Sequence, residues 1–186
     1  TAIAPCYYVT GNHEWARTDT EDLLTQIAAC GALVVSGCAG GIDAMAMEGA
    51  LETGAAVVGV LGGGVDVIYP RSNRKLFEDL LENGCLISEY PPEAQGIPWH
   101  FPARNRIISG VANGTLIVEA PEKSGALITA NYAKDQKKDV FVIPGNLDNP
   151  ACAGSNDLLR KGAKAALCGY DIVGIYKDRF PERVRN

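Results

Sequence analysis

Short, uninterrupted runs of apolar residues recur along the chain. The clearest are LVVS (residues 33–36), AVVGVL (56–61), TLIVE (115–119) and DVFVI (139–143). They have the length of strands and do not alternate apolar with polar positions, which is typical of strands covered on both faces. The segments CYYVT (6–10) and CLIS (85–88) complete six strand candidates.

Helix signals lie between these strands. In residues 18–30 a threonine can cap the first turn, and apolar residues repeat at helical spacing as far as Gly31. Further helices are predicted over residues 44–53, 73–81 and 157–161, from Ile107 onward, and from Glu122 onward. Strands that alternate with helices predict an α/β fold, with a mostly parallel sheet, helices on both faces and a single domain.

Glycine-rich turns follow several of the strands. SGCAGGID (36–43) leads from a strand into a helix, and this geometry can hold phosphate with backbone N–H groups alone. The same glycines also permit close packing of helix on strand without a ligand, and the spacing does not decide between the two. Turns that follow parallel strands gather at one edge of the sheet, where ligands bind. We expect five turns to meet there: residues 36–41, 62–66, 89–106, 120–125 and 144–154.

The stretch WHFPARNRIIS (99–109) is a basic, aromatic island without an acidic residue. It holds an aromatic pair, three potential cations and an asparagine, namely Trp99, Phe101, His100, Arg104, Arg106 and Asn105. Such a stretch fits a ligand that is anionic and can stack, and single-stranded nucleic acid is the commonest ligand of this kind. The alternative is a helix start whose arginines pair with neighbouring carboxylates.

The composition narrows the class of protein. A chain of 186 residues with 47% hydrophobic and 21% charged residues has the composition of an ordinary globular domain. The formal net charge of -5 argues against broad attachment to duplex DNA but allows a local positive groove. No apolar run approaches the roughly 20 residues of a membrane span, and no signal-peptide pattern is present, so we expect a cytoplasmic protein. The 6 cysteines lack metal-site spacing, and most of them fall in or beside apolar runs, as expected of reduced thiols.

Several segments together resemble a known family. SGCAGGIDAMAMEGAL, AVVGVLGGGVDVIYP, ISEYPP, HFPARNRIISG, VEAPEKSGALITA and VFVIPGN, in this order, resemble the Rossmann-like domain of the DprA/Smf DNA-processing proteins, over about residues 34–167. The resemblance implies a Rossmann-like DprA-type domain over residues 1–176, in which residues 1–33 form an atypical first strand and helix. We expect a solvated tail over residues 177–186.

The resemblance also implies a function. Members of the family bind and protect single-stranded DNA and help to load the recombinase RecA in natural transformation, as homodimers, without catalysis and without a cofactor or metal. Transferred position by position, their DNA-binding pocket comprises Ser36, Gly37, Gly41, Phe101, Arg104, Asn105, Arg106, Lys123, Ser124 and Gly125.

Each implied site residue has a physical task. Arg104 and Arg106 can grip phosphates, and Phe101 can stack on a base. Asn105 can bond a base edge or fix a loop. Arg106 can instead tie Glu89 or Glu119. Asp43 fits a helix cap or loop brace better than a phosphate contact, because a carboxylate repels phosphate.

The chain departs from the family at two places. Gly40 stands where members usually have a basic residue. The segment YYVTGNHEW (7–15) replaces the usual glycine-serine-arginine turn and resembles the GNHE turn of calcineurin-like metallophosphoesterases. Such an enzyme needs several histidines and aspartates for two metals, and this chain has 2 histidines, so we predict no metal site.

Two other functions use related folds. A phosphoribohydrolase that cleaves a base from a nucleoside monophosphate needs a carboxylate in the pocket, which Glu89, Glu119 or Asp43 could supply. Dinucleotide binding is a weaker option, because SGCAGG lacks the G-x-G-x-x-G spacing.

Overall fold

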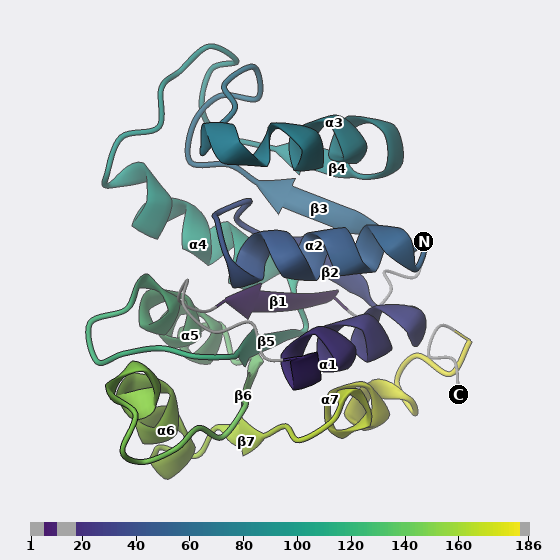
Figure 1. Ribbon diagram of the computed structural model, residues 1–186, viewed down its shortest axis with the longest axis vertical. Coiled ribbons are helices and arrows are strands. Elements are labelled where there is room, and N and C mark those ends of the chain that lie inside the picture. Colours follow the sequence, from purple (N-terminus) through teal and green to yellow (C-terminus); the bar gives the residue numbers. More distant parts are fainter. Residues whose placement is uncertain (1–5, 11–17, 183–186) are drawn as a thin grey trace.

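The chain folds around one parallel sheet. The computed structural model describes residues 6–10 and 18–182, including the side chains of residues 21–182. In this part of the chain the strands form a seven-stranded sheet in the order β4-β3-β2-β1-β5-β6-β7, and every pairing is parallel (Figure 1). In chain order the elements are β1 (Cys6–Thr10), α1 (Thr18–Ala29), β2 (Leu33–Ser36), α2 (Ile42–Glu52), β3 (Val57–Val60), η1 (Arg71–Asn73), α3 (Arg74–Asn83), β4 (Cys85–Ile87), α4 (His100–Val111), β5 (Gly114–Ile117), α5 (Gly125–Asp135), β6 (Asp139–Val142), η2 (Pro150–Cys152), α6 (Ala153–Arg160), β7 (Lys164–Ala165) and α7 (Gly169–Tyr176).

The side of the sheet on which new strands are added changes at β1, although all the strands remain parallel. Strands β1 to β4 are added outward on one side, and α4 then carries the chain back, so that β5 pairs with the other side of β1. Tyr8 is accordingly the partner of both Val35 and Thr115. The predicted α/β, Rossmann-like fold is confirmed.

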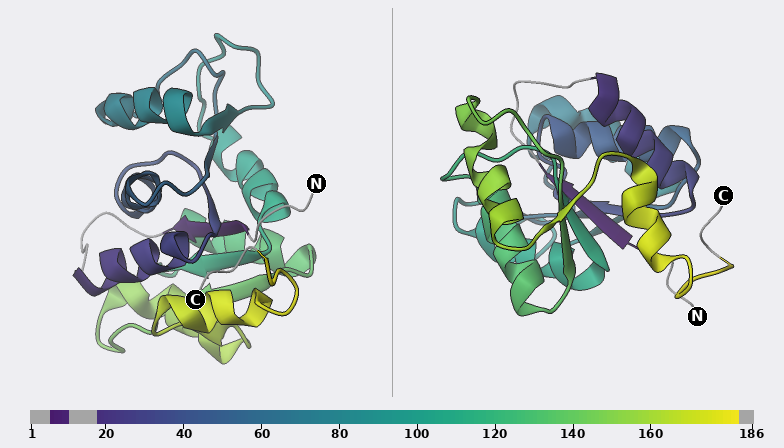
Figure 2. Two further views of the ribbon diagram at one scale, coloured as in Figure 1. Left: turned by 90° about the vertical axis from the view of Figure 1, so that its right-hand side faces the viewer. Right: turned by 90° about the horizontal axis from the view of Figure 1, so that it is seen from below.

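Helices cover both faces of the sheet (Figure 2). On one face, α1, α2, α3 and α7 bury a large apolar cluster that includes Ile27, Met47, Phe77 and Ile172. On the other face, α5 and α6 cover β5 and β6, while α4 packs on β2 and β3 through a small cluster around Ile108. The continuous apolar runs of the strands are thus explained by burial on both sides.

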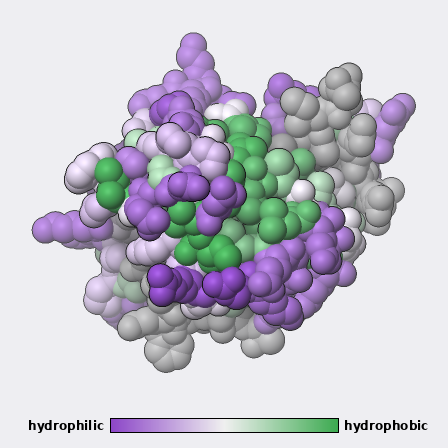
Figure 3. All heavy atoms as spheres, turned by 90° about the horizontal axis from the view of Figure 1, so that it is seen from above, coloured by the Kyte–Doolittle hydropathy of each residue, from purple (hydrophilic) through white to green (hydrophobic). Residues whose placement is uncertain are grey.

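The margin of the sheet at β4 is less completely covered. Seen from this side, apolar side chains gather in the middle of the surface and polar ones surround them (Figure 3). Val58, Ile87 and Ile107 pack around the cluster under α4 but are only partly buried. No helix in the described ranges is long and apolar enough to cross a membrane.

All six predicted strands are present, within a residue or two at their ends. The prediction was wrong near the C-terminus, where β7 and α7 were not expected, and α6 begins at Ala153, four residues before the predicted start. Within the predicted tail, Phe180 packs against the core. The GNHE turn, with Asn12, His13 and Glu14, lies outside the described residues.

Candidate functional site

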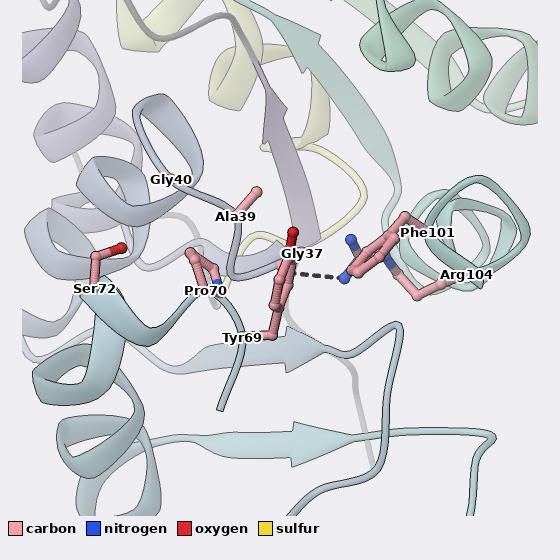
Figure 4. A pocket seen from close by; sticks show the side chains of 8 residues that line it. All are labelled: Gly37, Ala39, Gly40, Tyr69, Pro70, Ser72, Phe101 and Arg104. Atoms are coloured by element: carbon pink, nitrogen blue, oxygen red, sulfur yellow. Dashed lines mark hydrogen bonds between the residues drawn. The ribbon is translucent and has the colours of Figure 1, made fainter. Parts of the chain in front are cut away.

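A cavity of about 300 Å³ opens at the carboxyl ends of β2 and β3, beside the start of α4 (Figure 4). The described residues that line it are Gly37, Ala39, Gly40, Tyr69, Pro70, Ser72, Phe101 and Arg104. Three residues of the predicted pocket, Gly37, Phe101 and Arg104, therefore meet at one cavity. None of these described lining residues is a carboxylate.

Arg104 is a buried cation in the wall of this cavity, with 5% of its surface exposed. Its Nη1 donates hydrogen bonds to the carbonyl oxygen of Gly37, at 2.8 Å, and to that of Val60. Its Nε donates to Oδ1 of Asn105 at 3.2 Å. Arg104 therefore joins the ends of β2 and β3 to α4, and Asn105, itself buried, braces the guanidinium rather than facing the solvent.

Asp43 holds the same turn from the opposite side. Its Oδ2 accepts a hydrogen bond from the N–H of Gly37 at 3.3 Å, and the Ser36 hydroxyl and the Ala39 N–H also donate to this carboxyl group. The peptide groups of Gly37 are thus fixed between a buried carboxyl group and a buried guanidinium. The loop brace predicted for Asp43 is confirmed, and Ser36 acts with it beneath the surface.

Burial raises the pKa of Asp43 above its ordinary value of 3.8, while the charge of Arg104 and the donated hydrogen bonds oppose this rise. Because the pKa is higher in the folded state, the stabilisation from this group is complete below pH 3.8 and is lost as the pH rises through the folded-state pKa.

We expect the free energy of unfolding of the wild type to fall, relative to Asp43→Asn, as the pH rises from 4. Urea unfolding of both proteins between about pH 4 and 8 measures this, and a difference that stays constant or changes the other way contradicts it.

Two aromatic side chains line the cavity. The rings of Phe101 and Tyr69 are 5.2 Å apart between centroids and inclined by 38°. The Phe101 ring lies directly on Gly62, where an added Cβ would be 2.7 Å from Phe101 Cδ1. Tyr69 is 57% exposed, and the prediction did not include it. The sequence feature that could have identified Tyr69 is its place in VIYP, as an aromatic residue at the end of the glycine turn after β3.

Arg106 lies on a different side of α4 from Arg104. It forms an ion pair with Glu89, at 2.5 Å, and the two side chains are 48% and 43% exposed. The tie to Glu89 is therefore present, but at the surface, where such a pair contributes about 0–1 kcal/mol and can exchange for another anion. Arg106 is absent from the described residues that line the cavity.

The turn before α5 forms a separate part of the carboxyl edge. Lys123 is exposed, Ser124 Oγ accepts a hydrogen bond from the N–H of Ala126 at 3.2 Å, and a Cβ added at Gly125 would meet open space. Ser124 thus caps α5. Gly41 caps α2 with a φ of 74°, a left-handed conformation that favours glycine. Neither this turn nor Gly41 is among the described residues that line the cavity.

A second hollow of about 550 Å³ adjoins the cavity at Tyr69. Its described lining includes Arg71, Arg74 and Asp66. Both arginines are exposed, and neither takes part in the ion pairs found within the described ranges. The sequence prediction missed them, although the segment YPRSNRK places three cations directly after a turn at the carboxyl edge.

Comparison with known proteins agrees with this fold. The sequence profile of the family described as DNA recombination-mediator protein A matches residues 12–177. The DNA processing protein DprA of Bacillus subtilis is 42% identical over 161 residues, which are 87% of this chain and 53% of that protein. The chain spans about half the length, or less, of the curated relatives it matches.

Two solved structures are similar over most of the chain. The X-ray structure of DprA from Streptococcus pneumoniae has a TM-score of 0.84 and 35% identity, and covers 92% of this chain and 61% of that one. The structure of DNA processing protein A from Helicobacter pylori, described with its single-stranded DNA binding mode, has a TM-score of 0.82 and 28% identity and covers 97% of this chain and 82% of that one. This chain therefore belongs to the DNA recombination-mediator protein A family, the DprA/Smf proteins.

Proposed function

We propose that the chain is the single-stranded-DNA-binding part of a DprA-type protein. The observation that carries the proposal is the cavity at the carboxyl edge, in which an aromatic pair, a guanidinium group and a glycine-rich turn meet. A stacking surface beside a positively charged side chain fits an unpaired strand, whose bases and phosphates are both accessible. The single-stranded DNA binding described for the Helicobacter pylori relative supports the same ligand.

The parts of the site take different portions of the strand. A base stacks on Phe101 and Tyr69, and a phosphate lies against the turn that contains Gly40 and leads into α2. Arg106, Lys123 and the exposed arginines beside Tyr69 are available for the phosphates farther along. Two nitrogens of Arg104 are already bonded to the protein, so this side chain fixes the wall of the cavity. Its charge contributes positive electrostatic potential to the site.

The site is proposed to bind and not to catalyse. Three carboxylates were considered for a phosphoribohydrolase. Asp43 is bonded to the turn at Gly37, Glu89 is paired with Arg106, and Glu119 is buried. Incubation with nucleoside monophosphates should release no free base by chromatography. In the cell we propose a cytoplasmic homodimer that protects incoming DNA in natural transformation and helps to load RecA.

Binding of a labelled oligonucleotide over a range of salt concentrations tests the proposal. We expect binding at low salt, weaker binding of the duplex, and a fall in log K with log salt. Lys123→Ala should weaken binding whatever the sequence and reduce the slope by about 0.7, the value for one phosphate of a single strand. Lys161→Ala is the matched control, because Lys161 is exposed but paired with Asp157 after the end of α6. Failure to bind single strands, or preference for duplex, would contradict the proposal.

A further inference from the structure

Trp99 lies two residues before Phe101 of the proposed site, at the N-cap of α4. It is the residue that precedes α4, and 68% of its surface is exposed. We infer that Trp99 is a second base-stacking position, so that the strand bound at Phe101 continues across the start of α4 onto the Trp99 ring. This inference rests on the proposed function and adds a contact outside the cavity.

The Trp99 ring has a fixed support. It meets the His100 ring edge-on, with centroids 6.3 Å apart and an angle of 89°. His100 in turn stacks on Tyr90, with centroids 3.8 Å apart and an angle of 10°, and its Nδ1 lies 2.9 Å from the carbonyl oxygen of Gly62. A ring held in this way can receive a base with little loss of side-chain entropy.

The same anchor places Trp99 relative to the cavity. Gly62 contacts His100 through its carbonyl group and lies under the ring of Phe101. Trp99 and Phe101 are two residues apart, which on a helix turns their side chains by about 200°. A strand that stacks on both rings therefore has to cross the beginning of α4.

The beginning of α4 suits the phosphate that would lie between the two bases. The first turn contains no acidic residue, and the positive end of the helix dipole favours an anion, although the His100 N–H already bonds the Ile97 carbonyl group. The neighbouring acid Glu89 is already paired with Arg106. The aromatic rings and the positive helix end between them thus match the alternation of bases and phosphates in a single strand.

Intrinsic fluorescence gives a direct test, because the chain has 2 tryptophans, Trp15 and Trp99. In a Trp15→Phe background, titration with a thymidine oligonucleotide should quench the Trp99 emission along the same curve as the anisotropy of the labelled oligonucleotide. Trp99→Ala should weaken binding about tenfold, with the salt slope unchanged, and Trp99→Phe should retain most of the affinity. An oligonucleotide with abasic sites keeps its phosphates, so Trp99→Ala and wild type should bind it within about twofold of each other.

The controls separate this inference from the proposed function. Tyr170→Ala removes an exposed aromatic ring on α7 and should leave binding unchanged. The melting temperature of Trp99→Ala should match that of the wild type, because the lost ring is exposed. If the oligonucleotide binds while Trp99 emission and the affinity of Trp99→Ala are unaffected, Trp99 is not a stacking position and the proposed function stands. If no oligonucleotide binds by anisotropy, the proposed function and this inference both fail.

Discussion

Replacing Arg104 by alanine is expected to lower the free energy of unfolding by about 3–5 kcal/mol, the usual cost of removing one member of a buried charged network. The change leaves Asp43 buried without a nearby cation. It also removes the donor that the carbonyl groups of Gly37 and Val60 share, and unpaired buried polar groups are costly. Arg104→Lys should recover little of the loss, because one ammonium group cannot reproduce the fork of donors.

Urea unfolding measures this change, with Arg106→Ala as the matched control. Arg106 is the same residue type on the same helix, but its ion pair is near the surface, so its removal should cost about 1 kcal/mol or less. Equal, small losses for both variants would show that Arg104 does not join the two strand ends to α4. A loss of DNA binding in Arg104→Ala can come from the loss of stability. A loss of DNA binding in Arg106→Ala, which is expected to remain stable, indicates instead that Arg106 contacts the DNA.

The layers of the fold could be predicted from the sequence because burial leaves a clear pattern. Central strands such as β2 and β6 are continuous apolar runs, and the helices between them are bounded by caps and glycines. The edge strand β7 has two exposed residues, Lys164 and Ala165, and pairs only with β6, so it leaves no such pattern. The helix α7 contains two glycines, Gly169 and Gly174, which weaken the helix signal.

The direction of the arginines was harder to predict than their position. Arg104 and Arg106 are two residues apart on α4, so they face different sides, and the sequence motif treated them alike. The sequence did indicate the direction of Arg104, because apolar Ile108 follows it by four residues and therefore lies on the same face of the helix. In the structure Ile108 is completely buried. The partners of Arg104 could not be predicted, since Gly37 and Val60 come from strand ends that only the folded sheet brings together.

The second large effect is expected at Gly37, where alanine should lower the free energy of unfolding by about 1–3 kcal/mol and weaken DNA binding. An added Cβ would lie 2.5 Å from Nη2 and 2.8 Å from Cζ of Arg104. The guanidinium cannot retreat freely, because its nitrogens are bonded to Val60 and Asn105. It would shift within the wall of the cavity and alter the space beside Phe101.

Gly125→Ala separates this packing effect from the general effect of replacing glycine. Gly125 opens α5 with no atom within 4 Å of an added Cβ, so alanine there should stabilise the protein by about 0.4–1 kcal/mol, through the unfolded chain. Thermal unfolding and oligonucleotide binding of both variants measure the difference. If Gly37→Ala were as stable as the wild type and bound DNA equally well, the guanidinium of Arg104 could not lie against this turn. Retained stability with weakened binding would instead mean that Arg104 moves at little cost, and that the cavity needs it in place.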